Sequence, residues 1–162
     1  MPDLPSQAEL ATELEQQRRT ISELQTPVIQ VWEGVLALPI VGSLDTERTQ
    51  ETTEALLQKI VDTGSEIVLL DITGVPVVDT AVASHLLEMV SAARLLGCEV
   101  LIVGLSARIA ITLVHLGLDL SGVVTRTTLA KGLELAFARL GLAVVRRGEP
   151  PEPRPVAGAG AP

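Results

Sequence analysis

The pattern of apolar and polar positions predicts strands and helices that follow one another along the chain. Four stretches have the length and apolar character of strands: 28–42, which holds two strands joined at Glu33-Gly34, then 66–72, 99–105 and 122–127. The continuous apolar runs 66–72 and 99–105 indicate buried central strands. Pro39 indicates that its strand lies at a sheet edge or contains a bulge, because proline has no N–H for a ladder.

Helical patterns fill the stretches between and around these strands: 7–25, 45–63, 81–97, 106–117 and 128–142. Asp45 and Ser106 are natural N-caps, and Gly64, Gly97 and Gly117 are placed to end the helices before them. Strands that alternate with helices are typical of an α/β fold, with helices packed on the sheet. The short helix 7–25 precedes this unit.

The helix at 7–25 carries a short heptad-like seam. Leu10, Leu14, Ile21 and Leu24 recur at alternating steps of four and three residues, and Gln17 occupies the remaining seam position. Two interpretations stay open: a solvated lead-in helix that packs on its own domain, or a helix that pairs with the same helix of a second copy. Two heptads do not decide between them.

Composition narrows the classes of function. The formal net charge of −8 and an aromatic content of 1% argue against binding to nucleic acid or to a membrane surface. No signal peptide or membrane span is visible, so we expect a cytoplasmic protein. Cys98 is the only cysteine and is expected to be buried. We predict a helical linker (1–25), one domain (26–142) and a disordered Pro/Gly/Ala-rich tail (143–162).

The candidate chemistry is concentrated in two Asp-Thr pairs. Asp79-Thr80 and Asp45-Thr46 each follow a strand and open a helix, and Arg48 is within reach of the second pair. Capping accounts for one polar residue of a pair, whereas a hydroxyl at a helix N-terminus is also well placed to carry a phosphate. Whether the two pairs share one face of the domain is not fixed by sequence.

Enzymatic interpretations are weaker. No dinucleotide or phosphate-loop motif is present, and His85 and His115 are not at metal-ligand spacing, so no cofactor or metal is expected. Both histidines are interpreted as satisfied side chains on helix faces. Thr80 and His85 are five residues apart on one helix, a spacing that turns them away from each other. A small enzyme using Asp79 and Thr80 remains the minor alternative.

Three segments carry a family resemblance. "TPVIQVWEGVLALPIVGSLDTERTQ", "LLDITGVPVVDTAVASHLLE" and "IVGLSARIAITLVHLGLDLSGVVTRTTLAKGLELAF" resemble the STAS domain of RsbR-type stressosome proteins, which are relatives of anti-sigma factor antagonists. The match runs from about Thr26 to Phe137. It implies a STAS fold with a mixed β-sheet, and a cytoplasmic signalling module without catalytic activity.

The resemblance also implies partners and sites. RsbR-like and RsbS-like domains assemble into a large complex that holds an RsbT-like serine/threonine switch kinase, so self-association is expected as well. At matching positions the phosphorylated residues would be Thr46 and Thr80. Contacts with the kinase or another partner are expected at the following residues: Asp45, Arg48, Thr73, Gly74 and Asp79.

The resemblance has one departure and one competing interpretation. RsbR-like proteins usually carry a sensory domain before this module, and residues 1–25 resemble only the connecting helix, so we do not expect direct signal sensing from them. The competing interpretation is a general STAS anti-sigma factor antagonist that binds an anti-sigma kinase one-to-one. Threonine in place of the usual serine, and the second Asp-Thr pair, favour the stressosome type.

Overall fold

The computed structural model describes residues 3–25 and 27–148, without the side chains of residues 21–25. The elements follow in this order: α1 (Gln7–Gln25), β1 (Ile29–Trp32), β2 (Val35–Val41), α2 (Thr46–Thr63), β3 (Ile67–Gly74), α3 (Thr80–Leu95), β4 (Glu99–Val103), α4 (Ala107–His115), β5 (Val124–Arg126) and α5 (Leu129–Arg139). Every predicted element is present in the predicted order. The main differences are that β3 continues to Gly74 and that α3 begins at Thr80.

The strands form one five-stranded sheet in the order β1-β2-β3-β4-β5, the same as in the sequence. β1 is antiparallel to β2, and the other neighbours are parallel, which confirms the predicted mixed sheet. Pro39 does not lie on an edge strand, because β2 runs between β1 and β3. Instead the register between β2 and β3 shifts between Pro39 and Val41, which is consistent with the predicted alternative of a bulge.

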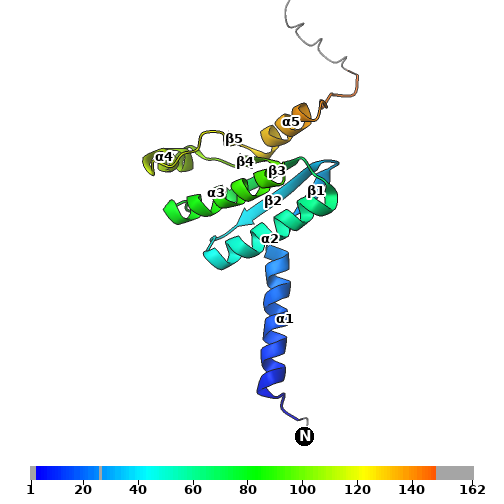
Figure 1. Ribbon diagram of the computed structural model, residues 1–162, viewed down its shortest axis with the longest axis vertical. Coiled ribbons are helices and arrows are strands. Elements are labelled where there is room, and N and C mark those ends of the chain that lie inside the picture. Colours follow the sequence, from blue (N-terminus) through cyan, green and yellow to red (C-terminus); the bar gives the residue numbers. More distant parts are fainter. Residues whose placement is uncertain (1–2, 26, 149–162) are drawn as a thin grey trace, which may run out of the picture.

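Alternate side chains of the buried strands point to opposite faces of the sheet, as the two-residue period of a strand requires. On one face, Leu38, Leu70 and Ile102 belong to a large apolar cluster with residues of α2, α3 and α4. On the other face, Leu69 and Val103 belong to a smaller cluster that includes residues of α5. Figure 1 shows α2 and α3 side by side, and α5 on the far side of the sheet from them.

The helix α1 extends away from this unit (Figure 1) and begins with a capping box. The Ser6 backbone N donates to Glu9 Oε2 at 2.7 Å, and the Glu9 backbone N donates to Ser6 Oγ at 3.2 Å. These hydrogen bonds to Ser6 lower the pKa of the Glu9 carboxyl below its usual range. All side chains of residues 7–20 are exposed, so packing of this part of α1 on its own domain is not supported.

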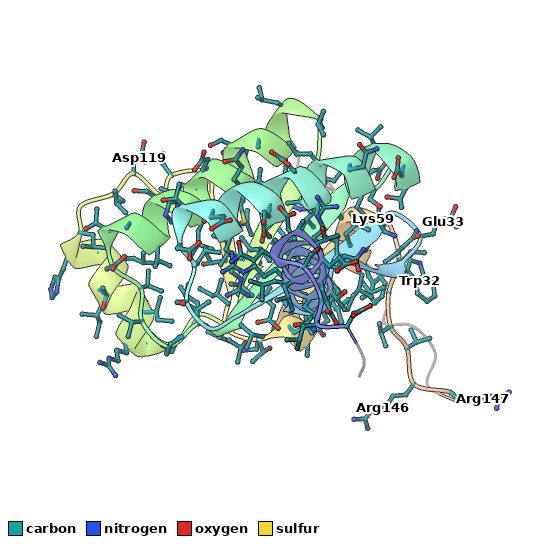
Figure 2. The ribbon with its side chains drawn as sticks, turned by 90° about the horizontal axis from the view of Figure 1, so that it is seen from below. Trp32, Glu33, Lys59, Asp119, Arg146 and Arg147 are labelled. Atoms are coloured by element: carbon teal, nitrogen blue, oxygen red, sulfur yellow. The ribbon has the colours of Figure 1, made fainter. Side chains whose placement is uncertain are left out.

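The two aromatic side chains of the chain pack against each other at the turn between β1 and β2. Trp32 meets Phe137 of α5 edge to face, with ring centroids 5.4 Å apart and an angle of 80° between the ring planes. Figure 2 shows Trp32 and Glu33 on the opposite side of the molecule from Asp119. The pair therefore links the edge strand β1 to α5.

The tail after α5 is only partly described. Residues 143–148 form no helix or strand and are exposed. The rest of the tail that was predicted to be disordered, residues 149–162, lies outside the described residues.

Candidate functional site

The two Asp-Thr pairs have the same local structure at the starts of α2 and α3. Asp45 and Asp79 are the N-caps, and both have extended backbone conformations. The Oδ1 atom of Asp45 accepts from the backbone N of Arg48, and Oδ1 of Asp79 accepts from the backbone N of Val82, each at 2.8 Å. Capping is thus performed by the aspartates, as the sequence indicated for Asp45.

This division of roles leaves the threonines as the first residues of their helices. Thr46 begins α2 and Thr80 begins α3, and both are exposed. A hydroxyl at this position lies beside backbone N–H groups that have no partner within the helix. It also lies at the positive end of the helix dipole, which favours an added negative charge.

A backbone hydrogen bond joins the two loops that carry the pairs. The N of Gly42, which follows β2, donates to the carbonyl oxygen of Gly74, the last residue of β3, at 3.0 Å. Gly42 has a φ of 81°, which favours glycine, and a Cβ on Gly74 would lie 2.9 Å from the carbonyl oxygen of Ile40. Because β2 and β3 are adjacent and parallel, their carboxyl ends meet at one edge of the sheet.

The loops border an open hollow that brings three of the seven predicted site residues together: Asp45, Thr46 and Asp79. Its lining comes from residues 43–46, from the β3–α3 loop and from the first turns of α3: Pro76, Val77, Asp79, Ala81, Val82 and His85. Asp45, Thr46 and Asp79 therefore face a common space, which sequence alone left open. Thr80 is not among the lining residues and lies at the rim of the same region.

Three further predicted contact residues, Thr73, Gly74 and Arg48, are not among the lining residues of the hollow. Thr73 donates from its backbone N and its Oγ1 to Oδ1 of Asp71, at 2.9 and 2.6 Å, so its hydroxyl is held within its own strand end. Gly74 is exposed and engaged with Gly42. Arg48 donates from Nη1 to the carbonyl oxygen of Ser43 at 2.5 Å, which helps to shape the loop before α2.

One lining residue was missed by the interpretation of the sequence. His85 was taken as an ordinary side chain on a helix face, yet it lines the hollow with Asp45 and Asp79. Its side chain is 16% exposed, and its Nδ1 lies 3.9 Å from Oε2 of Glu88. The available signal was spacing, because residues four apart, such as Ala81 and His85, lie on one face of a helix.

Apolar side chains are exposed next to these polar groups. Val77 in the hollow is 64% exposed, and Val41 at the end of β2 is 62% exposed. Exposed apolar and acidic side chains therefore lie next to one another at this end of the sheet. The arrangement offers a surface for a protein partner more than a deep cavity for a small molecule.

Two other features, a metal site and a membrane-spanning helix, are not found among the described residues. Among residues 3–25 and 27–148, no group of three or more His, Cys, Asp or Glu side chains is placed to hold a metal ion. In the same part of the chain, no helix combines the length and apolar character needed to cross a bilayer. Cys98 is buried, and burial, with the charges of Glu66 and Glu99, raises the pKa of its thiol to about 11.

Comparison with known sequences identifies the family of the chain. The family described as STAS domain matches residues 26–137. The RsbT co-antagonist protein RsbRA of Bacillus subtilis (strain 168) is 44% identical over 133 residues, which are 82% of this chain and 48% of that protein. The chain therefore spans about half the length of the curated relatives it matches.

Solved structures give the same result for the fold. A single-substitution variant of Moorella thermoacetica RsbS superposes with a TM-score of 0.62 at 31% identity, covering 71% of this chain and 98% of that one. A chain of the stressosome, described as a signal integration and transduction hub, superposes with a TM-score of 0.58 at 30% identity and the same coverage. The predicted STAS fold is thereby confirmed.

Proposed function

Since the chain belongs to the STAS domain family and resembles its RsbR-type stressosome members, we propose that it is a non-catalytic scaffold of a partner-switching pathway. In this role it binds an RsbT-like serine/threonine switch kinase, assembles with an RsbS-like STAS protein, and is phosphorylated on Thr46 and Thr80. The observation that carries the proposal is the pairing of two capped Asp-Thr helix starts around one hollow.

The geometry is favourable for a switch because a phosphate on either threonine alters the surface and spares the core. Each phosphate adds a charge of about −1.5 to −2 at neutral pH. The helix N-terminus stabilises that charge, and the capping carboxylate beside it opposes it. Since Thr46 and Thr80 are exposed, the change falls on the surface that includes Val77, not on the packed core.

This surface supports the proposed binding of a protein partner through two kinds of side chain. The exposed side chains of Val41 and Val77 supply apolar area, and Asp45 and Asp79 supply negative charge at the rim. Complementary binding would use an apolar centre with basic side chains around it. Phosphorylation would then change the charge of this contact surface and weaken or redirect the binding.

Self-association forms part of the proposal through α1. Leu10 and Leu14 lie one helical turn apart and are 50% and 55% exposed, as expected of a seam that pairs with a second α1. The side chains of Ile21 and Leu24, which would continue the seam, lie outside the described residues.

The test is site mapping after incubation with ATP and the switch kinase from the same organism, read by intact mass and fragmentation. We expect phosphate on Thr46 and on Thr80, each lost in the matching alanine variant. Thr128 is the matched control, because it is an exposed threonine at the start of α5 that follows no aspartate. Absence of label from both threonines, with the kinase active on another STAS substrate, would contradict the proposal.

A further inference from the structure

The two threonines are not equivalent with respect to the hollow. Thr46 lines it from the α2 side, whereas Thr80 does not. His85 lies on the opposite wall, on α3. Thr80 and His85 are five residues apart on this helix, which separates them by about 140° around its axis. Thr46 therefore borders the space that His85 also lines, whereas Thr80 is not among its lining residues.

His85 differs from the other residues that line the hollow in the charge that it can carry. Among the described residues that line the hollow, Asp45 and Asp79 are acidic and His85 is the one side chain that can become cationic. Glu88, one turn further along α3, lies 3.9 Å from its Nδ1. On the α2 side, Arg48 donates to the carbonyl oxygen of Ser43. The lining of the hollow beside Thr46 thus holds two carboxylates and one imidazole, and Arg48 is bonded to the loop before α2.

The position of His85 suits it to pair with such a charge. Its side chain is 16% exposed, so the imidazole is largely fixed and partly shielded from water. Interactions between charges are stronger where water is excluded, and a fixed side chain loses little conformational entropy on pairing. An imidazole and the second ionisation of a phosphothreonine also titrate close together, at about 6.5 and about 6.

We propose that His85 is the counter-ion of a phosphate on Thr46, so that modification at this site is coupled to uptake of a proton by the imidazole. The inference rests on the proposed function in taking Thr46 as the phosphoacceptor. His85 acts as a positioning residue: it holds the phosphate over the hollow and offsets its repulsion from Asp45 and Asp79. Thr80 lacks this partner, which makes the two sites chemically different.

The coupling has a defined direction. An opposite charge nearby favours the protonated imidazole, so phosphorylation of Thr46 raises the proton affinity of His85. By linkage, the phosphorylated state gains stability relative to the unmodified state as the pH falls through the titration of His85. Asp45, Asp79 and Glu88 are the acidic side chains around His85. The device makes the stability of the modified state depend on pH.

The experiment uses the full chain with phosphothreonine installed genetically at position 46, or at position 80 as the matched control. No kinase is needed, so the result bears on His85 alone, and kinase labelling tests the proposed function separately. The chain has two histidines, and their imidazole signals can be titrated by NMR. His115, exposed at the end of α4, serves as the internal reference.

We expect phosphate on Thr46 to move the titration midpoint of His85 upward by about 0.5 to 1 unit, a three- to tenfold gain in proton affinity. The midpoint of His115 should stay in place. By reciprocity the second pKa of the phosphate, followed by ³¹P NMR, should be lower in this protein than in its H85Q variant. An unmoved His85, or an equal movement with phosphate on Thr80, would overturn the inference.

Discussion

Replacement of Asp79 separates its role as a cap from its role as a charge beside Thr80. Oδ1 of Asp79 accepts from the backbone N of Val82 at 2.8 Å, and the side chain is exposed. Alanine removes this bond and leaves the first turn of α3 to water. Loss of such a cap costs about 1 kcal/mol of unfolding free energy, within a range of about 0.5 to 2. Asparagine keeps an equivalent cap, so D79N should lose only a few tenths of a kcal/mol.

Urea unfolding followed by far-UV circular dichroism would measure this difference. The single Trp32, packed on Phe137, supplies a second and independent fluorescence signal from the other end of the sheet. For a domain of this size, 1 kcal/mol corresponds to a fall in Tm of about 3 to 5 °C. Asp45 provides a matched pair of variants, because its Oδ1 caps α2 through the backbone N of Arg48 at the same 2.8 Å.

The reasoning would be refuted if D79A and D79N were equally unstable, since the loss would then come from charge and not from the cap. It would also be refuted if D79A lost less than about 0.3 kcal/mol. The kinase adds a second measurement on the same proteins. If Asp79 contacts the kinase through its charge, D79N should be folded yet poorly phosphorylated on Thr80.

Two further predictions follow from the packing. The variant G74A should lose about 1 to 3 kcal/mol of unfolding free energy, because its Cβ would lie 2.9 Å from the carbonyl oxygen of Ile40. A urea midpoint equal to that of the wild type would contradict the close approach. Cys98 should resist a thiol reagent at pH 8 until urea unfolds the chain, and immediate labelling would contradict its burial. Because its pKa is raised from 9.0 to about 11, the folded state keeps a proton that the unfolded state loses, so stability should fall as pH rises from about 9 to about 11. The variant C98A should lose that slope in urea titrations at stepped pH.

The sequence was sufficient to predict the elements because their signals are local. The apolar runs became β3 and β4, and Asp45 and Ser106 cap the helices that follow them. Pro39 was compatible with an edge or a bulge, and the sequence could not choose, because the neighbours of a strand depend on the rest of the sheet. The structure settled this through β1, which pairs beside β2.

The shared hollow could not be predicted for the same reason. Asp45 and Asp79 are 34 positions apart in the sequence, and they come together only because β2 and β3 are adjacent and parallel. His85 was missed because its sequence neighbours are apolar and suggest an ordinary helix face. Its relation to Thr46 depends on how α2 and α3 lie on the sheet. Local patterns thus located the candidate residues, and tertiary packing determined which of them face one another.

The sheet order has a consequence for how the chain acquires its fold. Each strand pairs with the strand before it in the sequence, so the sheet can grow by one strand at a time as the chain leaves the ribosome. The second face of the sheet, with Leu69 and Val103, is covered only when α5 is complete. A nascent chain that stalls before α5 would therefore expose that apolar face, and this is the stage of synthesis at which a chaperone would find a binding surface.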